Sequence, residues 1–338
     1  MRFNDWLLPD TWVVNSLRKL SITIIPIAAC LISACSHLPF FSTTQLDRRP
    51  TSLLLLNLYD QRSGPNASDY KWKGDWLFRR ERLGLIDRSL RVSKPDIVVF
   101  QDLIAKRGSP SDSDKNILAK GALEGYEWQL VEERLFEDTG ELSFHGFATS
   151  LPLRLLATPG QKFWPIGVDG GLSLAKIDVD GQSVLIFSLK MPKQSVQLDK
   201  WYQLVMDRVL SEQKIHDICS DRLVLVGYMP GQPSWQDFQN LLSTLNLTDS
   251  ATNFCQLTKD CLTESTENEI YASSVNIPTN SRSMRVFWPK SAQIIGSRRV
   301  LDDMKAKASE RSKRYGSDVL TPIQQYGWLS QARFLKCE

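Results

Sequence analysis

Short runs of apolar residues, each bounded by polar or turn-forming residues, recur along the chain from about residue 51 onward. Runs of this length and setting are typical of β-strands that are buried in a fold. They predict the strands Leu53–Leu58, Asp96–Phe100, Trp128–Val131, Leu172–Val179, Val184–Leu189 and Leu223–Val226.

Between these strands, apolar residues repeat at the spacing of an amphipathic helix. Ser234 and Asp237 stand at capping-box spacing at the start of one such stretch, with Asp in place of the usual Glu. Strands that alternate with helices predict an α/β fold. No Pro- or Gly-rich break divides residues 51–338, so we interpret them as one domain. The predicted helices are Trp76–Leu90, Lys200–Ile218 and Ser234–Leu245.

The N-terminal segment contains an uncharged, mostly apolar stretch over residues 20–34, preceded by basic residues. This stretch is shorter than the roughly 20 residues of a membrane-spanning helix and has the length and flank of a signal-peptide core. It ends in Ile32-Ser33-Ala34-Cys35, which resembles the bacterial lipobox, whose Cys takes a diacylglycerol before the preceding peptide is removed. We interpret residues 1–34 as a lipoprotein signal peptide, Cys35 as the lipidation site and residues 35–50 as a tether.

An uncleaved single anchor with an incidental cysteine is the alternative interpretation of this segment. The basic region before the apolar stretch is long and contains Asp5 and Asp10, which a misassigned start codon would explain. Ser36, rather than Asp, follows the cysteine. By the bacterial sorting rule, this residue predicts an outer-membrane location in the cell envelope.

Four cysteines remain in the chain after Cys35, and an exported protein meets oxidising conditions that permit disulfides. Cys255 and Cys261 are close in sequence within a polar stretch, which favours a local bridge between them. Cys219 and Cys337 would then form the second pair, and free buried thiols are the alternative.

The overall charge gives little guidance about partners, because 41 basic residues nearly balance 38 acidic ones. With 42% hydrophobic and 23% charged residues, the composition excludes a wholly disordered or polytopic membrane protein. One local segment, Arg298–Arg314, predicts a basic helix that would meet lipid headgroups or nucleic acid, unless it is simply a solvated helix. Its basic residues are Arg298, Arg299, Lys305, Lys307, Arg311, Lys313 and Arg314.

Six sequence blocks stand in an order that resembles the endonuclease/exonuclease/phosphatase superfamily, which has the deoxyribonuclease-I-like fold. The resemblance implies two packed mixed β-sheets flanked by helices, a four-layer αββα sandwich, over nearly the whole chain after residue 50. The blocks are LLLLNLYD from Leu53, W-x-x-R from Trp76, KPDIVVFQD from Lys94, GFATSLPL from Gly146, LVLVGYMPGQPS from Leu223 and GSDVLTP from Gly316.

The resemblance implies a phosphodiesterase centre, which this sequence matches only in part. Asn57 and Asp318 stand at the family's Asn and Asp positions, and Asp102 stands where the family has the Glu that binds Mg²⁺. Hard cations such as Mg²⁺ bind carboxylates, so Asp102 is a weakened candidate metal ligand. At the remaining family positions, Tyr228 replaces Asp, Pro230 replaces Asn, Val319 replaces His, and Leu189 or Lys190 replaces the second His.

Histidine, the usual acid–base group, occurs only at His37, His145 and His216, and none of these falls in an active-site block. We interpret His145 and His216 as surface or structural side chains. The sequence therefore predicts an envelope-anchored binding or scaffold protein without an intact catalytic centre and with no certain cofactor. An active phosphodiesterase with a rebuilt Mg²⁺ centre, such as a nuclease, a sphingomyelinase-like enzyme or a phosphatase, is the alternative.

The lipidation of Cys35 is testable in a bacterial host by metabolic labelling with an alkyne fatty acid. We expect the wild-type protein to take the label and to sediment with membranes, and Cys35→Ser to lose both properties. Cys30→Ser is the matched control and should keep the label, because Cys30 lies in the peptide that is removed. Membrane-bound, unlabelled wild-type protein would instead indicate an uncleaved anchor.

Overall fold

The computed structural model describes residues within a single compact unit, Arg48–Glu338. The residues 1–34, Cys35 and most of the predicted tether lie outside the described part. None of the described helices is long and apolar enough to cross a membrane. The described residues are 49–58, 79–106, 113–137, 140–150, 152–156, 163–166, 170–191, 198–229, 235–252, 254, 262–263, 283–301, 306–307, 319–320 and 327–335.

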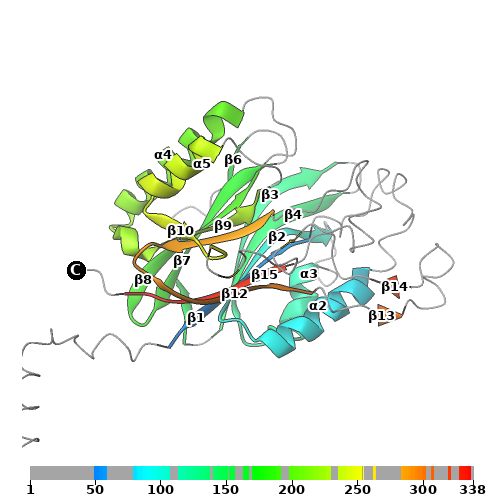
Figure 1. Cartoon of the computed structure of the whole chain (residues 1–338). Helices are drawn as coiled ribbons and strands as arrows, with labels where there is room; N and C mark the ends of the chain where they lie inside the picture. The colour runs from blue at the N-terminus through cyan, green and yellow to red at the C-terminus, as the bar shows by residue number, and fades with distance from the viewer. Residues whose placement is uncertain are drawn as a thin grey trace, which may run out of the picture. The chain divides into compact units, whose positions relative to one another are not determined.

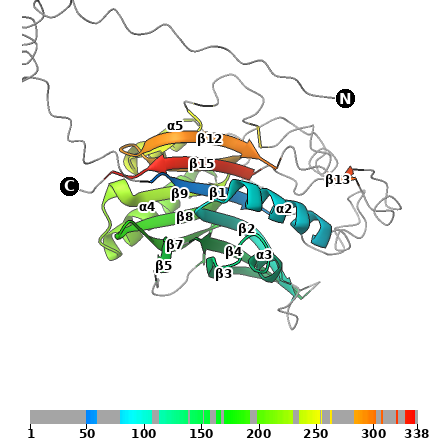
Figure 2. The same ribbon diagram turned by 90° about the horizontal axis from the view of Figure 1, so that it is seen from below.

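Two mixed β-sheets form the centre of the fold (Figure 1). In the first sheet, β1 and β2 are parallel and place Asn57 opposite Gln101, while the other neighbouring strands are antiparallel. Among the described residues this sheet has six strands, whose order is seen in Figure 2. They are β12 (Gln293–Val300), β15 (Gly327–Arg333), β1 (Thr51–Asn57), β2 (Ile97–Lys106), β4 (Glu141–Thr149) and β3 (Glu127–Phe136).

The second sheet has its own parallel pair, β8 and β9, in which Lys190 lies opposite Tyr228. A separate two-stranded ladder joins β13 (Ala306–Lys307) to β14 (Val319–Leu320). In the described part of the chain, the second sheet comprises, in order, β10 (Leu247–Asp249), β11 (Met284–Pro289), β9 (Leu223–Tyr228), β8 (Gln182–Lys190), β7 (Gly171–Val179) and β5 (Arg154–Leu156), and β6 (Phe163–Pro165) also pairs with β7.

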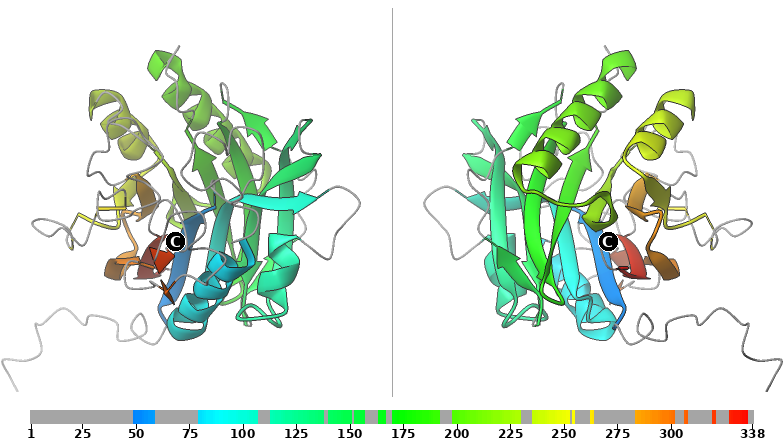
Figure 3. Two further views of the ribbon diagram at one scale, coloured as in Figure 1. Left: turned by 90° about the vertical axis from the view of Figure 1, so that its right-hand side faces the viewer. Right: turned by 90° about the vertical axis from the view of Figure 1, so that its left-hand side faces the viewer.

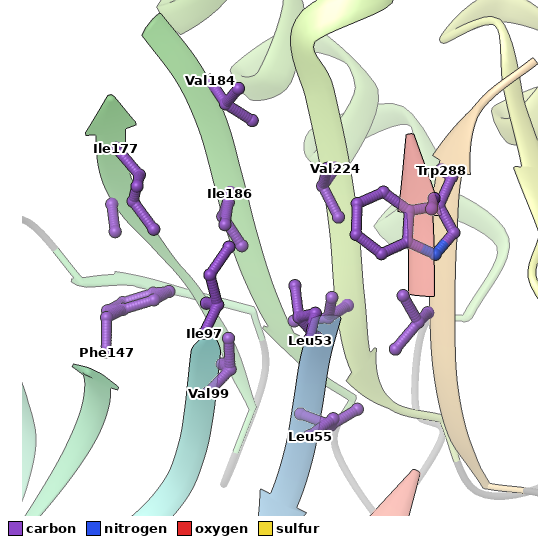
Figure 4. Close-up of a cluster of buried hydrophobic side chains, with 14 of the residues drawn as sticks. Leu53, Leu55, Ile97, Val99, Phe147, Ile177, Val184, Ile186, Val224 and Trp288 are labelled. Carbon is purple, nitrogen blue, oxygen red and sulfur yellow. The ribbon is translucent and has the colours of Figure 1, made fainter. Parts of the chain in front are cut away.

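The central strands of both sheets, such as β1 and β9, are apolar on both faces because both sides of each sheet are covered there. On β1, Leu53 and Leu55 face the other sheet, where they meet Val224 of β9 and its neighbours (Figure 4). The alternate residues Leu54 and Leu56 point to the opposite face and belong to a different apolar cluster. A continuous leucine run is therefore the sequence signature of a strand between two apolar layers.

Helices complete the sandwich on the outer face of each sheet. Leu83, Ile86 and Leu90 of α2 pack on the first sheet, and Trp201 and Val205 of α4 pack on the second. Figure 3 shows the two helical layers separated by the sheets. This arrangement confirms the predicted αββα sandwich. The helices are α2 (Arg79–Ser93) and α3 (Asp114–Ala119) on the first sheet, and α4 (Leu198–Ile215) and α5 (Trp235–Thr244) on the second.

Two tryptophans join the sheets by reciprocal hydrogen bonds. The Trp288 indole on β11 donates to Ser330 Oγ on β15 at 2.8 Å, and the Trp328 indole on β15 donates to Ser250 Oγ at 3.0 Å. All four residues are buried, so each indole N–H has a partner where water is excluded.

The predicted basic helix over residues 298–314 is wrong where the structure describes it. Arg298 and Arg299 lie in β12, paired with Leu329 and Trp328 of β15, and Lys307 lies in β13. β12 is the last strand of its sheet in the described part, and charged side chains are typical of such strands because they discourage further pairing. The residues Lys305, Arg311, Lys313 and Arg314 lie outside the described part.

Cys219, just before β9, is disulfide-bonded, and its partner lies outside the described residues. Nearby, the Arg222 guanidinium donates to the Leu335 carbonyl at 2.8 Å, so the C-terminal segment runs beside the segment of Cys219. Cys337 lies outside the described part, so the pairing of Cys219 with Cys337 stays a prediction. Cys255 and Cys261 lie outside the described part.

Gly227 allows β9 to lie close against β8 at the end of the strands. A Cβ atom at this position would lie 2.0 Å from the Leu189 carbonyl oxygen, which is a backbone atom and cannot move away alone. At Gly84 in α2, by contrast, a Cβ would meet nothing within 4 Å.

We therefore expect Gly227→Ala to lower the free energy of unfolding by about 3 kcal/mol, at the upper end of the overpacking range. Gly84→Ala is the matched control and should raise it by about 0.5–1 kcal/mol, because alanine favours a helix interior more than glycine does. Urea denaturation followed by tryptophan fluorescence measures both values. A Gly227→Ala protein as stable as wild type would contradict the close approach of β9 to β8.

Candidate functional site

The ends of the parallel strands bring four of the sequence-predicted positions to one region. Asn57, Lys190 and Tyr228 are the last residues of β1, β8 and β9, and Asp102 lies in β2. Gln101 joins the two sheets here, because its amide donates to Ser188 Oγ at 3.0 Å and to the Leu189 carbonyl at 2.9 Å.

Of the two residues that the sequence offered for the second histidine position, Lys190, and not Leu189, faces the other sheet. Leu189 belongs to the apolar cluster under α4 and α5 on the outer face. The next side chain along a strand points the opposite way, so Lys190 is directed toward the first sheet. Which of the two residues corresponds to the family's histidine stays a prediction, and Lys190 is the one that lies between the sheets.

A β-bulge turns Asp102 toward the second sheet. Ile97 and Val99 face that sheet, and simple alternation would place Gln101 inward and Asp102 outward. The pairing of β2 with β4 shifts between Phe100 and Leu103, so two residues of β2 oppose one residue of β4. Asp102 has a φ of 60°, a left-handed conformation that is costly for a non-glycine residue and is often found at functional sites.

Lys190 lies between two buried carboxylates. Its Nζ atom is 2.5 Å from Asp102 Oδ1 and 2.9 Å from Glu133 Oε1. The exposed fractions of the Lys190, Asp102 and Glu133 side chains are only 3%, 4% and 2%. Ser143 Oγ donates to Glu133 Oε2 at 2.9 Å and lies 3.3 Å from Asp102 Oδ1. We call Asp102, Glu133, Ser143 and Lys190 the lysine cluster.

Sequence reasoning missed Glu133, because the predicted strand stopped at Val131, before the charged pair Glu132-Glu133. The observed strand β3 continues to Phe136. Gln129 and Val131 face the second sheet, and Glu133 is the next residue in the same alternating row. That alternation is the signal that identifies Glu133 as an inward-facing carboxylate.

His145 lies beside the lysine cluster in the middle of β4. Its Nδ1 atom is 2.7 Å from Ser173 Oγ, and its Nε2 atom is 3.8 Å from Glu133 Oε2 with no hydrogen-bond partner. The side chain is fully buried, so the interpretation of His145 as a surface residue is wrong. Burial, reinforced by the Lys190 ammonium, lowers the pKa of His145 to about 3, so the imidazole is neutral at physiological pH.

The charges of the lysine cluster support one another. Burial alone would lower the pKa of Lys190, but the Asp102 and Glu133 carboxylates outweigh burial and raise it. Burial would likewise raise the pKa of Asp102, but neighbouring positive charges, chiefly the Lys190 ammonium and also Arg134, hold that pKa below its usual value. For Glu133, burial and the neighbouring Asp102 charge prevail, and its pKa is raised. At neutral pH, Lys190 and Asp102 therefore form a buried ion pair.

The described residues do not fit the Mg²⁺ centre that the resemblance implies. Asp102 Oδ1, which the resemblance implies as a weakened metal ligand, already contacts the Lys190 ammonium. In the described part of the chain, no three His, Cys, Asp or Glu side chains gather to hold a metal ion. The Lys190 ammonium thus pairs with the Asp102 carboxylate that a divalent ion would require as a ligand.

The other predicted positions add no acid–base group that the structure describes. Tyr228 is buried in the apolar core between the sheets, and Val319 lies in β14 opposite Lys307. Asp318, Pro230 and His37 lie outside the described residues. His216 follows α4 on the outer side of the second sheet, where its Nε2 atom lies 3.6 Å from Glu212.

Comparisons with known proteins agree with this fold. Neither a protein-family model nor a curated protein sequence matches the chain. Among solved structures, it is similar to TDP2 from Caenorhabditis elegans, with 12% identity, a TM-score of 0.59, and 85% of this chain and 75% of that chain covered.

Two bacterial structures from Bacteroides thetaiotaomicron are also similar. An endonuclease/exonuclease/phosphatase family protein has 17% identity and a TM-score of 0.58 over 84% of this chain and 96% of its own. A mannosyl-6-phosphatase has 16% identity and a TM-score of 0.58 over 84% of this chain and 100% of its own. The chain therefore has the endonuclease/exonuclease/phosphatase fold, as the sequence blocks indicated.

The neutral buried His145 predicts a specific pH dependence of stability. An unfolded histidine titrates near pH 6.5, whereas His145 in the folded protein has a pKa of about 3. Between these values the unfolded state binds more protons, so this residue's contribution to stability is lost as the pH falls from 6.5 toward 3. The loss approaches about 1.4 kcal/mol per pH unit within that window.

We expect His145→Gln, which keeps a polar side chain but does not titrate, to lose less stability than wild type between pH 6.5 and 4. Urea denaturation at several pH values measures the difference, and the contribution of Glu133 is present in both proteins. Identical pH profiles would contradict a neutral, buried imidazole.

Proposed function

We propose that this protein is a lipid-anchored component of the bacterial envelope whose endonuclease/exonuclease/phosphatase-like domain binds a ligand or partner without hydrolysing it. One observation is the main support for the proposed loss of hydrolysis. The strand ends at which the family places a histidine and an aspartate hold Lys190 and Tyr228, and both side chains are buried.

Neither of these side chains replaces the missing acid–base groups. The carboxylates around Lys190 raise its pKa, although burial opposes them, so the amine is protonated at neutral pH and accepts no proton. A phenol such as Tyr228 is ordinarily a poor base near pH 7. General acid–base catalysis contributes typically 10²–10⁴-fold, and a metal ion contributes several kcal/mol of charge stabilisation. The loss of both would remove most of a hydrolytic rate.

The anchoring part of the proposal rests on the lipobox at Cys35, and Ser36 favours the outer membrane. Contact with an anionic surface is a further part of this proposal. Arg298 is exposed on β12 and the basic residues that follow it are close in sequence. Binding through these residues should weaken steeply with salt, because contacts with phosphate groups release counterions.

An active phosphodiesterase or phosphatase is the second candidate, and Asn57, together with Asp102 in place of the family's Glu, favours it. Asn57 is the last residue of β1, and Asp102 lies within β2. Similar folds include a mannosyl-6-phosphatase and a TDP2 structure complexed with a single-stranded DNA product. A rebuilt centre would have to free Asp102 from Lys190.

Turnover of fluorogenic phosphate diesters and monoesters, with Mg²⁺, Mn²⁺ or Ca²⁺, distinguishes the two candidates. We expect the wild-type rate to equal that of Asp102→Ala, because neither protein has a metal ligand available to the substrate. Asp207→Asn on the exposed face of α4 controls for the loss of a carboxylate elsewhere. Turnover that a folded Asp102→Ala protein lacks and Asp207→Asn retains would establish the enzyme instead.

A further inference from the structure

We propose that the Lys190 ammonium is the resident cation of this domain, and that it excludes divalent metal ions by occupying the position between Asp102 and Glu133 where such an ion would bind. The inference rests on the proposed function and extends it: without Lys190, the same carboxylates would form a divalent-cation site. The expected ligand class is a hard cation such as Mg²⁺ or Mn²⁺.

The geometry of the lysine cluster is the first support. A single nitrogen atom lies within 2.9 Å of one oxygen of each carboxylate, so both oxygens converge on one point. Carboxylate oxygens bind hard divalent ions at about 2.0–2.6 Å, so only a small closure of the two side chains would bring both into coordination range. Ser143 contacts both carboxylates and helps to hold them toward that point.

An unsatisfied ligand atom is the second, independent support. Asp102 Oδ2 is buried and has no hydrogen-bond partner among the described residues, although a buried carboxylate oxygen is normally satisfied. The backbone of Asp102 is also held at a positive φ by the bulge in β2. The strained residue thus presents both a paired and an unpaired oxygen in the same region between the sheets.

The charge balance is the third support. Among the described side chains, the Lys190 ammonium is the cation in hydrogen-bond contact with both Asp102 and Glu133, and the charge of Arg134 also favours the ionised form of Asp102. Removal of the ammonium would leave two acidic groups side by side where water cannot screen them. Proton uptake or a divalent cation would then be needed to restore neutrality.

A purely structural salt bridge makes a different prediction from a resident cation. If Lys190 only fills space and pairs with Asp102, Lys190→Ala should be less stable than wild type and should bind no metal ion. If the cluster is a cation site, the shortened side chain should leave room for an ion and its water molecules. Lys190→Met fills most of this space without charge and should respond less than Lys190→Ala.

The experiment measures Mn²⁺ binding by electron paramagnetic resonance and the melting temperature with and without Mn²⁺. We expect no response from wild type. For Lys190→Ala we expect bound Mn²⁺ and a rise of about 5 °C at a concentration about 100-fold above the dissociation constant, reversed by EDTA. Lys190→Ala combined with Asp102→Asn should lose the response. Lys214→Ala, on the exposed face of α4, controls for the loss of a lysine elsewhere and should resemble wild type.

Wild-type protein that binds Mn²⁺ and loses it on Asp102→Asn would overturn the inference, as would a folded Lys190→Ala that binds none. If Lys190→Ala folds only when Mn²⁺ is present, the inference is supported, and if it fails to fold even then, a divalent ion does not replace the ammonium. A wild-type protein that hydrolyses the phosphate esters but binds no Mn²⁺ at Asp102 would refute only the proposed function. Mn²⁺ bound at Asp102 without turnover would refute only this inference.

Discussion

The contact of the Lys190 ammonium with Asp102 and Glu133 is the interaction on which the chemistry of this domain depends. Three side chains from β2, β3 and β8 meet in the space between two sheets, where they are at most 4% exposed. A buried ion pair adds little net stability, but the removal of one partner leaves an uncompensated charge and costs about 3–5 kcal/mol. The three positions are therefore coupled, and the neutral state of the neighbouring His145 follows partly from the same ammonium.

The rest of the sandwich is organised so that this charged cluster is tolerated. The space between the sheets is filled mainly by aliphatic and aromatic side chains, and the polar groups that cross it bind the opposite sheet. Gln129 on β3 donates to the Leu174 carbonyl on β7, and Trp288 and Trp328 donate to serines across the interface. These directional bonds define the register between the sheets, which nonpolar packing alone would specify less sharply. The carboxylates and the ammonium are consequently held at fixed positions.

The sandwich and the strand-end positions were predictable from the sequence, and the lysine cluster was not. Both faces of β1, β8 and β9 are covered, so these strands are uninterrupted apolar runs in the sequence. The sequence therefore predicted the ends of these strands to within about two residues. The inward turn of Asp102 depends on a bulge, and the pairing shift with β4 has no sequence signal in a single chain. Glu133 was missed because two adjacent charges resemble the end of a strand. The basic residues of β12 were assigned to a helix because charge spacing alone does not report that β15 is the neighbour.

The presence of Asp102 at a metal-ligand position is therefore weak support for catalysis in this chain. A carboxylate between two sheets requires a counter-charge whether or not the domain is an enzyme. Where Lys190 supplies that charge, an acidic residue at position 102 is needed for stability alone, and a neutral replacement would leave the ammonium without one of its two partners. Under our proposal, Lys190 and Asp102 depend on each other, because the lysine ammonium replaces a metal ion that could dissociate. In this chain, the acidic residue at position 102 does not by itself indicate a metal centre, because Lys190 already pairs with it.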